Sequence, residues 1–65
     1  MKLLELIGAV RTDNLPLILM NKDGTTAWQG TFGSFSRHEN MREYINREVY
    51  RFSGDGVYGI SVRLM

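Results

Sequence analysis

Cysteine is absent from this chain of 65 residues, which also contains only one histidine, one proline and one tryptophan. No disulfide can therefore stabilise the fold. A tetrahedral zinc site of cysteine and histidine is excluded as well, because a single histidine supplies too few ligands. Domains of this length commonly need a disulfide, a metal or a partner subunit. We expect no cofactor. Association with another chain is then the remaining way to stabilise the fold.

The sequence also lacks a strong net charge and a long apolar run. The formal net charge is +1, with 43% hydrophobic and 23% charged residues. A charge this close to zero produces no field that attracts a polyanion over a distance. No segment approaches the roughly 20 apolar residues that cross a bilayer, and Glu5 interrupts an apolar start that is otherwise similar to a secretory signal. We expect one domain, residues 1–65, located inside a cell and without membrane contact.

Catalytic motifs are missing too. The seven carboxylates form no recognisable catalytic pair, and the seven glycines are dispersed without a phosphate-binding loop. His38 is the obvious candidate for acid–base chemistry, with Ser34 and Ser36 nearby in sequence. That closeness follows from a predicted helix start and does not create a nucleophile–base geometry. We therefore predict a protein that is not an enzyme.

The clearest pattern is a hairpin over residues 15–32. Leu15–Met20 is continuously apolar, which is typical of a strand covered on both faces or of one whose outer face meets another chain. The following sequence NKDG favours a tight turn. Trp28 and Phe32 then share one face of the return strand and are predicted core anchors. Gly30 between them indicates a bulge or a close approach by another backbone.

The residues before this hairpin have helical periodicity. The apolar face of the predicted helix consists of Leu3, Leu4, Ile7 and Val10. Leu6 lies off that face, and a strand with Leu4 and Leu6 inward is the alternative. Pro16 at the start of the next strand predicts that this strand lies at or near a sheet edge, because proline donates no backbone hydrogen bond.

A second helix is predicted to begin near Ser36. Ser36 and Glu39 have the spacing of a capping box, in which each side chain satisfies a backbone amide at the helix start. Glu43 and Arg47 are placed for a helical ion pair. The predicted apolar stripe of this helix is Met41, Tyr44 and Ile45.

The last third is predicted to be a second hairpin, with its turn at residues 54–56. On the final strand the predicted inward residues are Tyr58, Ile60, Val62 and Leu64. We expect Tyr50 to be partly exposed if Val49 is buried. The predicted fold class is therefore α+β, a small domain ordered helix-strand-strand-helix-strand-strand with an antiparallel sheet of about four strands, covered on one face.

Six of the eight cationic residues are arginines, which are enriched at protein interfaces together with tyrosine, tryptophan and methionine. We predict a protein-binding or oligomeric module, in which surplus aromatic side chains are covered by a second copy or another protein. An exposed first strand would also allow edge-to-edge pairing with its copy. The predicted contact residues are Tyr50, Arg51, Tyr58 and Arg63.

A small nucleic-acid-binding regulator is the alternative. In it, phosphate contacts and base stacking would come from Arg42, Arg47, Arg51 and Arg63 together with Tyr50 and Tyr58. Interleaved glutamates and the low net charge weigh against it. Binding that disappears steeply with added salt would favour it, whereas retained capture of a protein would favour the first interpretation.

The order of these features resembles small proteins encoded by phages and prophages of Gram-positive bacteria. The resemblance covers nearly the whole chain through MKLLELIG, the NKDG turn, the W-x-G-T segment at Trp28, Tyr44, and the REV sequence at Arg47. These motifs are structural and transfer no active residues, and the chain departs from the pattern in a longer polar segment around residues 36–40. The resemblance implies an accessory role in the cytoplasm of a bacterial host, on a host protein or a defence system such as CRISPR.

Overall fold

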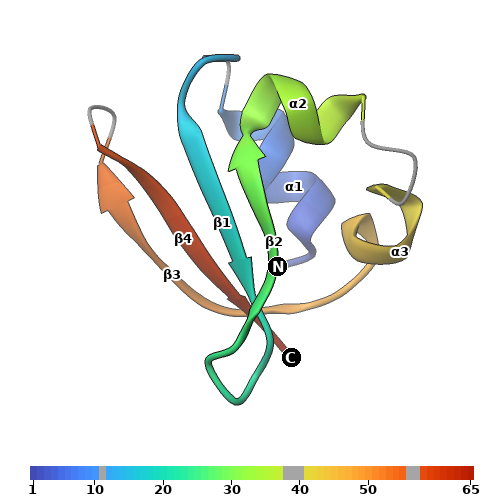
Figure 1. The fold of residues 1–65 in the computed structure, drawn as a ribbon. Helices are drawn as coiled ribbons and strands as arrows, with labels where there is room; N and C mark the ends of the chain where they lie inside the picture. The colour runs from blue at the N-terminus through green and yellow to red at the C-terminus, as the bar shows by residue number, and fades with distance from the viewer. Residues whose placement is uncertain (11, 38–40, 56–57) are drawn as a thin grey trace.

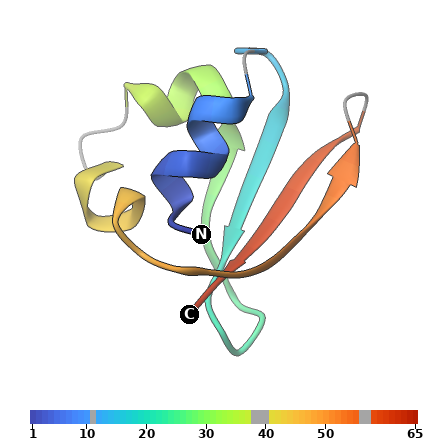
Figure 2. The same ribbon diagram turned by 180° about the vertical axis from the view of Figure 1, so that it is seen from behind.

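The computed structural model describes residues 1–10, 12–37, 41–55 and 58–65. His38 and Glu39 lie outside these ranges, as does the predicted capping interaction. In chain order the described elements are α1 (Leu3–Ala9), β1 (Pro16–Met20), β2 (Thr26–Thr31), α2 (Phe32–Ser36), α3 (Met41–Ile45), β3 (Val49–Asp55) and β4 (Gly59–Leu64). Figures 1 and 2 show one sheet with the helices on one of its faces. The predicted α+β class is confirmed.

The strand order is β2-β1-β4-β3, with antiparallel pairing inside each hairpin. The two hairpins meet through β1 and β4, which are parallel, from Leu17 opposite Ile60 to Met20 opposite Arg63. The prediction of a wholly antiparallel sheet is wrong at this pair. Its cause is the connection through α2 and α3, which crosses one face of the sheet and brings β4 beside β1 in the same direction (Figure 1).

The first strand is therefore interior, and the edge position predicted from Pro16 is wrong. Proline is tolerated because Pro16 is the first residue of β1, and the pairing with β4 begins only at Leu17. Edge-to-edge pairing of β1 with its copy is excluded for the same reason, since β2 and β4 occupy both of its sides.

The core lies between the sheet and the helices. Its buried residues are Leu3, Leu6, Leu15, Leu17, Leu19, Phe32, Phe35, Val62 and Leu64. Trp28 is half-buried and packs against Phe35, with ring centroids 5.1 Å apart in a T-shaped arrangement. A Cβ atom at Gly30 would lie 2.6 Å from the Trp28 ring. Gly30 therefore leaves room for the Trp28 ring of the same strand. The close approach of another backbone, which was one of the two predictions for Gly30, is not what the structure shows.

Residues 3–9 form a helix, so the alternative of a strand is wrong. Leu3 and Leu6 are buried and Ile7 is half-buried, whereas Leu4 is 52% exposed. The predicted apolar face is therefore wrong at Leu4 and Leu6. The observed stripe places Leu6 and Ile7 three and four residues after Leu3, which is helical spacing. The chain start is fixed to the base of β3 by the Val49 amide, which donates to the Met1 carbonyl at 2.8 Å.

The helix predicted to begin near Ser36 is wrong at its start. Ser36 is the last residue of α2, and its hydroxyl donates to the Phe32 carbonyl at 3.1 Å. Thr31 caps this helix, since its Oγ1 accepts from the Ser34 amide at 3.1 Å. Burial of Phe32 and Phe35 places the helical turn here, with its cap five residues before Ser36.

The stripe predicted on the next helix is confirmed in α3, where Met41, Tyr44 and Ile45 pack against the core. The predicted ion pair between Glu43 and Arg47 does not form, because α3 ends at Ile45. The Nη2 atom of Arg47 donates instead to the Met65 carbonyl at 3.0 Å.

The NKDG turn is confirmed. The Gly24 backbone has φ +94°, a conformation that glycine adopts without steric cost. The Asn21 amide closes the turn by donating to the Thr25 carbonyl at 2.7 Å. None of the helices among the described residues is long and apolar enough to cross a membrane.

Candidate functional site

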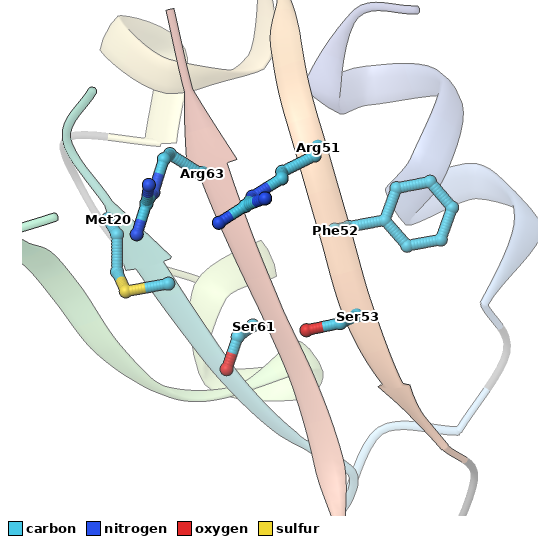
Figure 3. Close-up of a pocket in the computed structure, with 6 residues that line it drawn as sticks. All are labelled: Met20, Arg51, Phe52, Ser53, Ser61 and Arg63. Atoms are coloured by element: carbon cyan, nitrogen blue, oxygen red, sulfur yellow. The ribbon is translucent and has the colours of Figure 1, made fainter. Parts of the chain in front are cut away.

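The sheet has one face without helices, and the β3–β4 hairpin presents polar side chains there. Successive residues of a strand alternate between faces, so the burial of Val62 and Leu64 on the helix side places Ser61 and Arg63 on the open side. Arg51 lies directly opposite Arg63, and Ser53 lies directly opposite Ser61. Figure 3 shows these four side chains on one side of the strands.

These residues line a shallow cavity of about 530 Å³. Met20, which lies beside Arg63 on β1, forms an apolar part of the wall. Phe52 also contributes, although its side chain points away from the arginines (Figure 3). We call this cavity the arginine groove, defined by Met20, Arg51, Phe52, Ser53, Ser61 and Arg63.

The charges in the arginine groove are not balanced. Two cations directly opposite each other on neighbouring strands destabilise a sheet, and neither Arg51 nor Arg63 forms an ion pair with any residue described. Within the described chain, the Nε atom of Arg63 is buried and has no hydrogen-bond partner. Buried donors are normally satisfied. The groove therefore has unused hydrogen-bond donors and excess positive charge.

Asp23 is an acidic side chain within the electrostatic reach of Arg63, and its carboxylate is hydrogen-bonded elsewhere. The Asp23 carboxylate accepts from the Thr25 amide at 3.0 Å and from the Thr25 hydroxyl at 2.7 Å. These two hydrogen bonds hold the pKa of Asp23 below its ordinary value, and the positive charge of Arg63 lowers it further. The Arg63 guanidinium approaches the same turn, because a Cβ atom on Gly24 would lie 3.5 Å from its Nη2.

The outer edge of β3 is the second notable feature. This strand of seven residues pairs with β4 on one side and with no strand described on the other. Tyr50 is 54% exposed and Phe52 is 48% exposed. Figures 1 and 2 show that the helices cover the β1–β2 half of the sheet and leave the outer part of the β3–β4 hairpin uncovered. Two exposed aromatic side chains therefore lie on an edge strand that has no described strand on its outer side.

Two of the four predicted contact residues are brought together, namely Arg51 and Arg63. Tyr50 lies near the start of β3, and its partial exposure beside a half-buried Val49 is confirmed. Tyr58 is 85% exposed at the opposite end of the hairpin. Its predicted inward position is wrong, because β4 begins only at Gly59.

The prediction omitted four residues of the arginine groove: Met20, Phe52, Ser53 and Ser61. The two serines follow from a two-residue period, since each lies two positions from an arginine on its own strand. Met20 had no such signal, because its place beside Arg63 depends on the parallel pairing of β1 and β4.

The chemistry of the arginine groove is that of an anion receptor. Guanidinium groups only donate hydrogen bonds, and serine hydroxyls can donate as well. Among the residues described, no cluster of histidine and acidic side chains is suited to a metal ion.

No protein-family model matches the chain, and neither the curated proteins nor the solved structures contain a match.

Proposed function

We propose that this protein is a binding module without enzymatic activity, which recruits another protein through the free edge of β3. The observation that carries the proposal is the combination of a seven-residue edge strand with two half-exposed aromatic side chains, Tyr50 and Phe52. Natural proteins protect edge strands with proline, lysine or a covering element. The sequence of β3, VYRFSGD, contains neither residue, and its protection is limited to Arg51 and the register shift between Val49 and Arg51.

The other edge strand is less suited to such pairing. β2 continues directly into α2. On β2 the Trp28 ring occupies the space above Gly30 and packs against Phe35 of the core. An added strand would pair with β3 beyond Val49, whose amide is bonded to Met1. Backbone hydrogen bonds would give affinity there and side-chain contacts specificity.

Charge indicates that the partner is a different protein and not a second copy. Antiparallel pairing of β3 with its copy would bring both Arg51 side chains onto one face, each beside the Arg63 of its own chain. Four cations would then gather without an ion-pair partner among the described residues. An extended segment with acidic side chains would complement the same face.

The resemblance to small phage and prophage proteins suggests a host protein as this partner. The nucleic-acid alternative gains less support, because the four arginines it needs are dispersed. Arg42 belongs to α3 in the helix layer, and Arg47 is bonded to the chain end. Of these four arginines, Arg51 and Arg63 lie on the open face, where they could contact a duplex or single strand.

The proposal is tested by selecting binders from a random peptide library and mapping their position by amide hydrogen exchange. We expect acidic, extended peptides that slow exchange in β3. Binding should weaken by about tenfold in Tyr50→Thr and Phe52→Thr, which remove aromatic contact area and keep strand propensity. Leu4→Gln is the matched control, since Leu4 is equally exposed but lies on α1.

Three results would contradict the proposal. They are failure to select any binder, protection confined to the helices, and a dimer in solution that Phe52→Thr dissociates. The last result would make a second copy the occupant of the edge. Steep loss of binding with salt to an oligonucleotide, but not to peptides, would favour the nucleic-acid alternative.

A further inference from the structure

We infer that the arginine groove is a binding site for a phosphomonoester, a phosphate group carried on one organic substituent. This inference goes beyond the proposed function, because a phosphate can bind to Arg51 and Arg63 without a strand at β3. The arginines and serines of the groove lie on the face that lacks helices, so a ligand can approach them from that face (Figure 3).

The donor arrangement fits a group with several oxygens. Residues directly opposite on paired strands have Cβ atoms roughly 5 Å apart. The Arg63 guanidinium lies toward the Gly24 turn, and once it turns toward Arg51 the two guanidinium groups can reach one anion. Ser53 and Ser61 form a second opposed pair two positions further along the strands. Guanidinium forks form paired hydrogen bonds with phosphate oxygens.

The charge of the two arginines favours a phosphomonoester over a carboxylate or a phosphodiester. Two cations without ion-pair partners in the described chain require a ligand with close to two negative charges. A phosphomonoester carries about −1.5 to −2 at neutral pH. A carboxylate and the diester of a nucleic-acid backbone each carry a single charge, which would leave one guanidinium without compensation.

The remaining features of the groove favour an ester over free phosphate. The volume of about 530 Å³ is much larger than one phosphate, and Met20 adds an apolar wall beside Arg63. An organic substituent can occupy that space and contact the thioether. The unsatisfied Nε of Arg63 supplies a further donor once the guanidinium turns toward the anion.

The experiment is an NMR titration of the ¹⁵N-labelled protein with phenyl phosphate and, as a matched ligand, benzoate. Both probes carry one aromatic ring, and the ionic strength is held constant. We expect phenyl phosphate to shift the amide signals of β3 and β4 around the four polar residues, and to saturate at a concentration at least about tenfold lower than benzoate. Equal saturation by benzoate would overturn the inference.

Variants locate the site. Arg51→Gln and Arg63→Gln should each weaken phenyl phosphate binding by at least about tenfold, because each removes a charge-assisted contact. Arg51 is exposed on an edge strand, so Arg51→Gln retains the fold even where Arg63→Gln does not. Arg37→Gln is the control, since Arg37 is exposed at the end of α2. Unchanged binding in Arg51→Gln would refute the assignment.

Two further comparisons complete the test. A short oligothymidine without a terminal phosphate should bind more weakly than phenyl phosphate. Tighter binding of the oligothymidine would overturn the inference and indicate a nucleic-acid site in the groove. Tyr50→Thr should leave the titration unchanged, because its side chain does not line the groove. Failure of phosphate binding is therefore distinguishable from failure of peptide binding at the β3 edge.

Discussion

Replacing Arg51 by glutamate is expected to stabilise the protein, since it converts a pair of like charges on adjacent strands into an opposite pair. Arg51 lies directly opposite Arg63 in the β3–β4 ladder. A directly opposed charge pair contributes roughly 0.2–1 kcal/mol, with a sign set by the charges. Removing the repulsion and adding an attraction therefore gives about 1 kcal/mol. In a domain of this size such a change raises Tm by roughly 4–8 °C.

Urea unfolding followed by the fluorescence of Trp28 measures this change, because the indole packs on Phe35 and loses that environment on unfolding. Arg51→Gln, which only removes the repulsion, should give about half of the gain. Arg51→Lys keeps the charge and should change the free energy of unfolding little. The gain should shrink between about 0.01 and 1 M salt, as the screening length falls from roughly 30 to 3 Å.

A destabilised Arg51→Glu variant, or a gain that does not respond to salt, would refute this reasoning. Either result would mean that the Arg63 guanidinium is held toward the Gly24 turn strongly enough to remove it from the field of Arg51.

Three other regions of the structure give distinct expectations. Gly30→Ala should cost about 1–3 kcal/mol and shift the tryptophan emission, because the new Cβ atom would lie 2.6 Å from the indole. Gly8→Ala is its control and should stabilise the helix by about 0.5–1 kcal/mol, since nothing lies within 4 Å of that site. Thr31→Ala should cost about 1 kcal/mol in urea unfolding as the loss of a helix cap, whereas Ser36→Ala should cost less. Asp23 has a lowered pKa in the folded protein, so its contribution is fully present above the unfolded pKa of about 3.9 and is lost as the pH falls further. The urea midpoints of the native protein and Asp23→Asn should therefore converge below about pH 4, and an unchanged difference would contradict the hydrogen bonds to that carboxylate.

Local patterns in the sequence predicted the elements better than their arrangement. The NKDG turn and the stripe of Met41, Tyr44 and Ile45 depend on neighbours within a few residues, and the structure confirms both. The helix start at Ser36 is also a local pattern, yet Thr31 offers a competing cap. Phe32 and Phe35, which lie between Thr31 and Ser36, are buried, and this burial favours the helix that Thr31 caps. A pattern of capping residues contains no information on burial.

The arginine groove depends on register, which the sequence did not determine. A turn centred on Asp55, as predicted, would place Arg63 opposite Arg47. The strand β3 instead continues through Asp55, so that Arg51 lies opposite Arg63, and the register shifts only beyond this pair, between Val49 and Arg51. A displacement of one residue would have put the two arginines on different faces. The composition thus indicated a surface rich in arginine. Which arginines lie together, Arg51 and Arg63, depends on the length of the hairpin.

Register also explains why stability and binding should respond to Arg51 in opposite directions. If Arg51 had a purely structural role, its replacement would lower the free energy of unfolding. Since it opposes a second cation, replacement by glutamate should raise that free energy and abolish the binding of phenyl phosphate at the same time. An anion that binds only the folded state stabilises it by mass action. Phenyl phosphate should therefore raise the urea midpoint of the native protein and leave that of Arg51→Glu unchanged, and an equal rise in both would show that the anion acts elsewhere.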